Sequence, residues 1–272
     1  MMISLLSGFL FSFLIAAFAY QKRSLSKSGA VAAIVVGTNV YAFGSLFWYG
    51  LLLTFFISSS ALSRLKKQKK DVVAKDLFEK TGQRDVMQVL ANGGLGTLFV
   101  WFAAASMDTL PWMVAYVGVI AAVNADTWGT ELGVLSRGKP RHILTGRLVE
   151  KGTSGGISVW GTLGTALGGL WIGLFASLFQ LILAENGWQL FWLWIGLLSG
   201  LLGALIDSVL GATVQLMYGC SICGGETERC EHCGAKTRRI RGVGGCNNDA
   251  VNLLSSAAGG LIAWLCWRVI GF

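Results

Sequence analysis

Long apolar runs, separated by short polar segments, dominate the chain. Several of these runs approach or exceed the roughly 20 residues that an α-helix needs to cross the hydrocarbon core of a bilayer. We expect eight such helices, covering residues 2–20, 29–44, 45–63, 86–106, 111–133, 155–184, 188–216 and 247–267. The second and third are short and adjoin one another, which favours a hairpin. The pattern predicts an all-α, polytopic transmembrane bundle in which residues 1–272 form a single domain.

The composition supports a membrane protein. Hydrophobic residues make up 54% of the chain and charged residues 13%, and the mean hydropathy is +0.61. Because a soluble domain carries about 25% charged residues, this chain has little charge with which to cover a water-exposed surface. The 37 glycines fit the same class, since glycine lets membrane helices pack closely.

The basic residues fall almost entirely into alternate loops. If the N-terminus lies outside, the loops 21–28, 64–85, 134–154 and 217–246 face the cytosol, and they hold 21 of the 22 Lys and Arg residues. This partition follows the positive-inside rule, and it explains most of the net charge of +8 without a nucleic-acid partner. Such basic loops also attract anionic membrane lipids.

The first apolar run is expected to be a membrane span. No basic residue precedes it, and Lys22, Arg23 and Lys27 follow it, which is the reverse of the order in a cleaved signal peptide. The sequence shows no transit peptide, which favours a bacterial cell membrane over a plastid envelope.

Polar residues within the expected spans gather near their cytosolic ends. Four are carboxylates, namely Asp126, Glu131, Asp207 and Asp249, and the asparagines among them include Asn92, Asn124, Asn248 and Asn252. Asparagine in a span often only hydrogen-bonds a neighbouring helix, whereas charged groups usually face a cavity and serve a function. We therefore expect the carboxylates to converge on a hard cation, Mg²⁺ bound to phosphates, with the asparagines orienting the ligands.

The third cytosolic loop combines glycine with positive charge. Lys139, Arg141 and Lys151 lie in it, and Gly152, Thr153, Ser154, Gly155 and Gly156 open the sixth span. Glycines let backbone N–H groups approach an anion, and a helix N-terminus adds a positive dipole. The segment is not a Walker A sequence. We expect it to bind phosphate together with Arg84, although attraction to lipid headgroups explains part of the charge.

Four cysteines stand in two pairs in the fourth cytosolic loop. The stretch CSICGGETERCEHCG places them at Cys220, Cys223, Cys230 and Cys233. Two such pairs suit a closed, tetrahedral, four-thiolate zinc site, and thiols stay reduced in the cytosol. We expect a structural zinc ion held by these four residues, with His232 outside the ligand set; a redox pair is the alternative.

Five segments together resemble an integral membrane family that includes phytyl-phosphate kinases of plants and cyanobacteria. They are GQRDVMQVLANGG (82–94), NADTWGTELG (124–133), GTSGGISVWGT (152–162), DSVLGATVQ (207–215) and NNDAVNLLSS (247–256). The resemblance covers nearly all of the chain from Ser58 to Ser256. The family is more distantly similar to phytol and dolichol kinases and to CDP-diacylglycerol synthase.

The resemblance implies phosphoryl transfer from a nucleoside triphosphate, CTP, to an isoprenoid monophosphate. Phytyl phosphate, which feeds tocopherol biosynthesis, is the type substrate. Phosphoryl transfer depends mainly on positioning and on neutralising charge, so acidic helix ends beside a basic, glycine-rich loop suit it. A secondary transporter, a membrane scaffold whose cysteine loop recruits a partner, and a lipid-alcohol kinase or cytidylyltransferase are the alternatives. Buried carboxylates and glycine-broken helices also occur in transporters.

Overall fold

The chain forms a bundle of long helices in the computed structural model, which describes residues 1–65, 82–183 and 189–270. The helices are α1 (Met2–Gln21), α2 (Lys27–Asn39), α3 (Leu46–Arg64), α5 (Val86–Ala105), α6 (Leu110–Leu135), α7 (Val159–Leu183), α8 (Leu190–Thr213) and α9 (Asn248–Ile270). Apart from α2, each of these is long and apolar enough to cross a membrane, which gives seven candidate spans in the described ranges. The expected helical bundle is confirmed.

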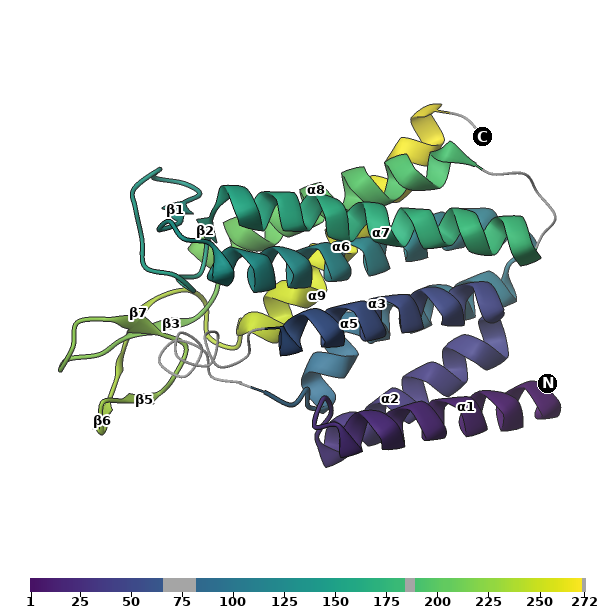
Figure 1. Ribbon diagram of the computed structural model, residues 1–272, viewed down its shortest axis with the longest axis horizontal. Helices are drawn as coiled ribbons and strands as arrows, with labels where there is room; N and C mark the ends of the chain where they lie inside the picture. Colours follow the sequence, from purple (N-terminus) through teal and green to yellow (C-terminus); the bar gives the residue numbers. More distant parts are fainter. Residues whose placement is uncertain (66–81, 184–188, 271–272) are drawn as a thin grey trace.

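The second expected span is the exception in length. α2 has 13 residues and continues into a π-helical turn, η1 (Val40–Gly44), directly before α3. Figure 1 shows that α1 begins and α9 ends at the same end of the bundle. A chain that starts and ends on the same side of a membrane crosses it an even number of times. Since the seven long helices give an odd number, α2 together with η1 supplies the remaining, short crossing, which is the second in chain order.

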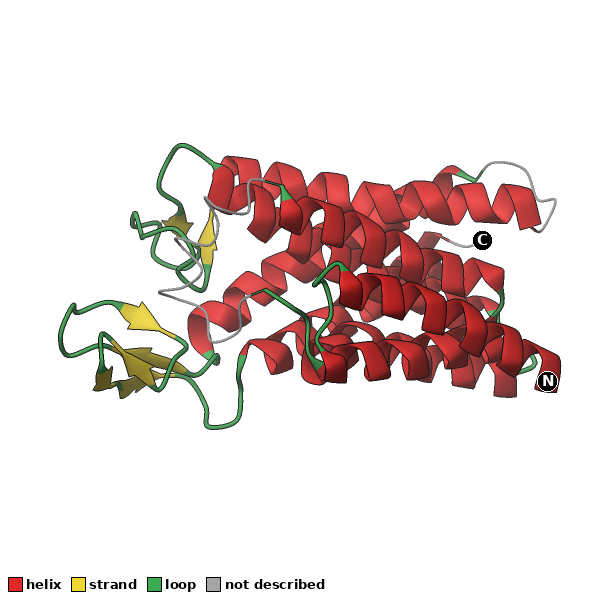
Figure 2. Cartoon of the chain, turned by 60° about the horizontal axis from the view of Figure 1, so that its bottom comes forward, coloured by secondary structure: helices red, strands yellow, loops and turns green. Residues whose placement is uncertain are grey.

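The loops at the other end of the bundle carry all the described strands (Figure 2). β1 (Arg141–His142) pairs antiparallel with β2 (Gly156–Ile157) and closes the loop between α6 and α7. Between α8 and α9, β3 (Met217–Gly219), β4 (Glu226–Thr227) and β7 (Arg238–Arg241) form a sheet in the order β4-β3-β7, and β5 (Glu231–His232) pairs with β6 (Ala235–Lys236). Most of the expected basic loop 64–85 lies outside the described residues.

α6 is the central helix of the bundle. Twelve consecutive residues, Val114 to Ala125, are buried, and the helix contacts α3, α5, α7, α8 and α9. Gly118 allows α9 to approach closely, since a side-chain Cβ there would collide with Ala263. Tyr116 donates a hydrogen bond to the carbonyl of Trp48 (2.7 Å). The polar end of α6 is thus held in a fixed position among five neighbours.

α1 and α2 form a separate layer against the bundle (Figure 1). The buried positions of α1 are Gly8, Ser12, Ala16 and Ala19, which recur at the helical spacing and let α2 pack closely. The remaining surface of α1 exposes large apolar side chains, as expected of a helix that faces lipid.

A backbone bridge connects this layer to the start of α5. Arg84 accepts a hydrogen bond from the Ser26 amide (3.0 Å) and donates its own amide to the Ser24 carbonyl (3.0 Å). Asp85 then caps α5 in a reciprocal pair with Gln88, an arrangement that satisfies two helix-terminal amides. The two sets of contacts fix the backbone of Arg84 between α2 and α5.

Candidate functional site

A polar cavity of about 360 Å³ opens among the helix ends that carry the loops. Its size falls in the usual range for ligand pockets. Helices α3, α5, α6, α7, α8 and α9 contribute to its wall, as does the loop between α6 and α7. The wall includes the predicted residues Arg84, Asn92, Asp126, Glu131, Lys151, Gly152, Thr153, Ser154, Gly155, Gly156, Asp207, Asn248 and Asn252. Residues far apart in the sequence therefore meet here as expected.

Four carboxylates line this polar cavity, and three of them, Asp126, Glu131 and Asp207, lie on helices. Asp126 and Asp207 lie on α6 and α8, close enough to interact electrostatically. The Ser255 hydroxyl donates a hydrogen bond to Asp207 Oδ2 (2.8 Å), and the Ser63 hydroxyl donates one to Glu131 Oε1. Two neighbouring carboxylates repel one another unless a cation or a proton lies between them, so the pair Asp126 and Asp207 suits a bound cation.

Arg84 brings positive charge to the same cavity. Its Nη1 donates a hydrogen bond to the Ser60 hydroxyl (3.0 Å), and its guanidinium lies 5.8 Å from the Phe55 ring centre and 5.6 Å from that of Phe56. Burial lowers the pKa of Arg84 to about 10, and the nearby Glu131 carboxylate opposes that shift. Arg84 therefore remains charged at neutral pH.

The glycine-rich loop is packed tightly against α8. Gly155 has a φ of +82°, and a Cβ there would lie 2.5 Å from the Cβ of Ala212, so both conformation and space require glycine. The amides of Thr153 and Gly156 donate hydrogen bonds within the loop. Among the described residues, the amides of Gly152, Ser154 and Gly155 have no such partner. Lys151, whose Nζ donates to the Ser136 carbonyl, adds a positive charge to the cavity wall.

Asn92 has an unpaired acceptor in the cavity wall. Its Oδ1 is buried and has no hydrogen-bond partner within the described part of the chain. Buried polar atoms in proteins are nearly always paired, so this oxygen marks a position for a ligand, an ion or a water molecule.

Four predicted site residues do not line the polar cavity. Asn124 is buried elsewhere and joins three helices, because it donates to the Gly168 carbonyl (2.7 Å) and accepts from Ser58 (3.0 Å) and Ser59 (3.1 Å). It therefore acts as a packing residue. Asp249 is buried in the first turn of α9 and is also absent from the described cavity wall.

The other two are basic residues on the loop surface. Lys139 forms an ion pair with Glu150 in which both side chains are largely exposed. Arg141 donates to the Gly146 carbonyl (2.9 Å) within its own loop. Neither lies in the described cavity wall, although Pro140 between them does.

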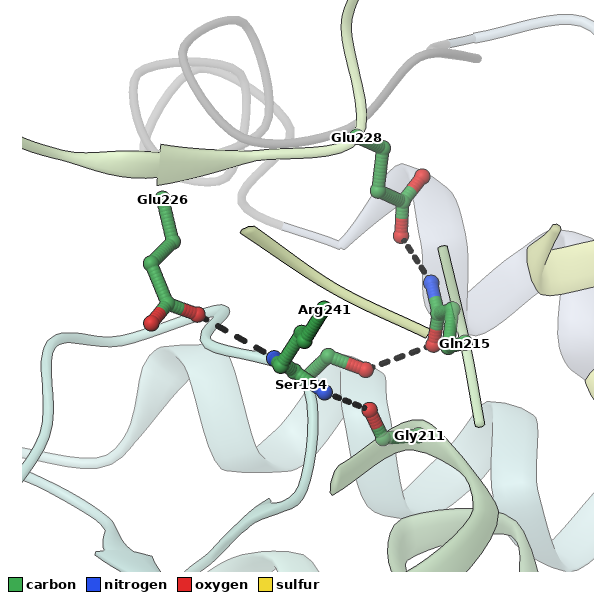
Figure 3. Close-up of polar contacts among 6 residues, drawn as sticks. All are labelled: Ser154, Gly211, Gln215, Glu226, Glu228 and Arg241. Carbon is green, nitrogen blue, oxygen red and sulfur yellow. Dashed lines mark hydrogen bonds and ion pairs between the residues drawn. The ribbon is translucent and has the colours of Figure 1, made fainter. Parts of the chain in front are cut away.

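Glu228 lines the cavity although the sequence analysis did not select it. Figure 3 shows how it reaches there: Ser154 donates to Gln215 Oε1 (2.6 Å), and Gln215 Nε2 donates to Glu228 Oε1 (2.8 Å). Gln215 thus joins the glycine-rich loop to the segment between the two cysteine pairs. No periodic sequence pattern surrounds Glu228. The only sequence signal for this contact is the polar residue Gln215 directly after α8.

A second pair of contacts holds the cysteine-bearing segment against α8. Arg241 on β7 pairs with Glu226 on β4 (3.5 Å) and donates to the Gly211 carbonyl at the end of α8 (2.5 Å; Figure 3). The sheet whose connecting segments carry the cysteines is therefore fixed to the helix that carries Asp207.

The cysteine segment brings together a different ligand set from the one expected. Cys220, Cys223, His232 and Cys233 have ligand atoms that all lie within 4.8 Å of one another. His232 Nδ1 lies 3.5 Å from Cys223 Sγ and 3.3 Å from Cys233 Sγ. The structure thus groups His232 with three cysteines, whereas the sequence analysis had chosen Cys230, because the β5–β6 hairpin turns His232 inward.

One thiol of this cluster is more acidic than an ordinary cysteine. All six cysteines are free, so no disulfide joins the two pairs. Hydrogen bonds, first from the Cys223 backbone and then from His232, lower the pKa of Cys220 to about 6. A thiol that is readily deprotonated is the form that binds metal.

The sequence profile of an integral membrane protein family, DUF92, matches residues 10–260. The chain belongs to the DUF92 family. It is a multi-pass integral membrane protein, as its helices indicate. The resemblance inferred from the five motifs is thereby confirmed at the level of the family.

Several relatives align with most of the chain. Protein PGR of Arabidopsis thaliana is 35% identical over 92% of each chain. An uncharacterized membrane protein of Methanocaldococcus jannaschii is 32% identical, covering 90% of this chain and 87% of its own. "Protein VTE6, chloroplastic" of Arabidopsis thaliana is 26% identical, over 90% of this chain and 66% of its own. No solved structure matches the chain.

Proposed function

We propose that this protein is a kinase that transfers a phosphoryl group from a nucleoside triphosphate to a prenyl monophosphate, giving the diphosphate. One observation carries the proposal: Asp126, Asp207, Arg84 and Lys151 line a single cavity at the loop end of an apolar bundle. Such a cavity offers ligands for a phosphate-bound cation and charges for the phosphates themselves. The motif resemblance to phytyl-phosphate kinases supports the same reaction.

The donor atoms in the cavity fit Mg²⁺. This ion prefers carboxylate and other oxygen ligands and usually keeps several waters. In this proposal Asp126, Asp207 and Glu131 would hold the ion, and the unpaired Asn92 Oδ1 would accept a hydrogen bond from a bound ligand or water. When bound to the nucleotide, Mg²⁺ neutralises the charge that develops on the transferring phosphate.

The remaining residues position the two substrates. Arg84 and Lys151 attract the phosphates, and the amides of Gly152, Ser154 and Gly155 donate to their oxygens. An oxygen of the prenyl monophosphate attacks the γ-phosphorus; that P–O bond forms as the bond to the β-phosphate oxygen breaks, and the nucleoside diphosphate leaves. The attacking oxygen is already anionic at neutral pH, so no general base is required. The motif resemblance favours CTP as the donor.

The cluster of Cys220, Cys223, His232 and Cys233 is proposed to hold a structural zinc ion. Thiolate and imidazole ligands suit zinc, and four protein ligands leave no open position for chemistry. In this role the ion stabilises the segment that carries Glu228 to the cavity.

The test uses purified protein in detergent with phytyl phosphate, phytol or phosphatidate, each offered with CTP or ATP and Mg²⁺, and mass spectrometry of the products. We expect a diphosphate from phytyl phosphate and CTP. Phosphorylated phytol would instead indicate a lipid-alcohol kinase, and CDP-lipid a cytidylyltransferase. The absence of nucleotide turnover with all three lipids would contradict the proposal and favour a transporter or a scaffold.

Two lysines provide a matched pair for the same assay. Lys151→Ala removes a charge from the cavity wall, whereas Lys139→Ala removes one from an exposed ion pair. We expect Lys151→Ala to raise the KM for nucleotide by about tenfold, the effect of losing one charge-assisted contact, and Lys139→Ala to leave it unchanged. Equal effects would show that the basic loop acts only through its overall charge.

A further inference from the structure

A second hollow, here called the apolar groove, lies between α1, α2, α3 and α5. Its enclosed volume, measured as for the polar cavity, is about 70 Å³, and it is open on one side. Its wall is formed mainly by apolar side chains, among them Ile15, Ala33, Val36, Leu52, Phe55 and Phe56. Two of its few polar side chains, Ser12 and Tyr49, are hydrogen-bonded to one another (3.3 Å). Away from Arg84, Gln88 and Asn92, the groove therefore offers an apolar contact surface to a ligand.

The apolar groove and the polar cavity share part of their walls. Arg84, Gln88 and Asn92 line both. These residues lie at the start of α5, and the backbone bridge to Ser24 and Ser26 holds Arg84 in place. One ligand with a charged end and an apolar end can therefore occupy both spaces at once.

The residues at the junction match such a ligand. The Arg84 guanidinium faces the polar cavity near Glu131, while its planar group also lies against the Phe55 and Phe56 rings that line the groove. Arginine is well suited to bind phosphate while stacking on aromatic rings. The unpaired Asn92 Oδ1 lies on the same wall.

We propose that the apolar groove binds the isoprenoid chain of the prenyl monophosphate, with the phosphate beside Arg84 in the polar cavity. The inference rests on the proposed function and extends it, because it assigns the chain of the substrate to the α1–α2 layer. Without this layer the groove would lose one wall, which gives α1 and α2 a role in substrate binding beyond anchoring in the membrane.

The first test maps the chain of a bound ligand directly. Purified protein is incubated, without nucleotide, with a prenyl monophosphate that carries a diazirine near the far end of its chain. After illumination, labelled peptides are identified by mass spectrometry. We expect label on groove residues of α1, α2 and α3, and competition by phytyl phosphate. Label confined to α7 or α8, or a groove filled by phospholipid that phytyl phosphate does not displace, would overturn the inference.

A matched pair of substitutions on α2 tests the same point by activity. Ala33→Phe fills the groove, whereas Val35→Phe adds the same ring to a lipid-facing position that is 56% exposed. We expect Ala33→Phe to raise the KM for phytyl phosphate by at least about tenfold, since several buried methylene contacts are lost. The KM for dimethylallyl phosphate, whose chain is too short to fill the groove, should not change. The proposal would be contradicted if both variants raised the KM for phytyl phosphate equally. It would also be contradicted if Ala33→Phe raised the KM for both substrates equally.

The two tests separate this inference from the proposed function. Label in the groove without phosphoryl transfer to any lipid would remove the kinase assignment and leave a prenyl-phosphate binding site. Phosphoryl transfer with label outside the groove would leave the kinase and remove the chain site.

Discussion

At the scale of single residues, the structure separates two carboxylates that the sequence treats alike. Asp126 lines the polar cavity, whereas Asp249 is buried at the start of α9 outside the described cavity wall. We expect Asp126→Asn to lower kcat by about 10²- to 10³-fold, as losing one preorganised electrostatic contact does. Asp249→Asn should change the thermal stability more than kcat. Steady-state kinetics at several Mg²⁺ concentrations and thermal unfolding of both variants check this.

An equal effect of the two substitutions on catalysis would support the metal site of four carboxylates expected from the sequence. If Asp249→Asn shifts the Mg²⁺ dependence as much as Asp126→Asn does, Asp249 acts on the ion. Asn124→Ala gives a further comparison, because loss of its contacts to α3 and α7 should destabilise the bundle without shifting that dependence.

The residue scale also shows where sequence reasoning ends. Asp126, Asp207 and Arg84 were predicted because charge at the end of an apolar run needs a polar surrounding. Asn124 was predicted to orient ligands but lies outside the described cavity wall, since an amide satisfied by three neighbours looks identical in sequence to one that faces a ligand. Glu228 was missed because its position depends on how the cysteine segment folds back on Gln215. The spacing of residues in the sequence does not indicate such a tertiary contact.

At the scale of elements, the cysteine segment is expected to fold around one zinc ion. The structure groups His232 with Cys220, Cys223 and Cys233, so Cys223→Ser should release the metal while Cys230→Ser retains about one ion per chain. Elemental analysis of the purified variants measures this, and cobalt substitution gives an independent thiolate absorption band. Full zinc in Cys223→Ser with loss in Cys230→Ser would disprove the assignment. The two-pair spacing predicted a metal site with Cys230 as the fourth ligand, whereas the structure places His232 beside the other three.

At the scale of the whole molecule, the sequence predicted the bundle well. Seven of its spans are long apolar helices, because a bilayer imposes a length and a composition that a single sequence displays. The short second pass was harder to predict, since α2 is completed only by the π-helical turn η1. The apolar groove was not predicted at all. It arises where α1 and α2 lean on α3 and α5, and apolar residues that line a groove have the same pattern as those that face lipid.

The orientation of the bundle supplies the last prediction. All the described strands and the polar cavity lie at one end, where the basic loops gather, and from the positive-inside rule we expect that end to face the cytosol. A protease site inserted after Gly138, in the α6–α7 loop, should be cut in inside-out vesicles only. One inserted after Met107, in the exposed turn between α5 and α6 at the opposite end, should be cut in right-side-out vesicles only. The reverse pattern would place the polar cavity outside, away from cytosolic nucleotide, and would exclude a nucleotide-dependent kinase.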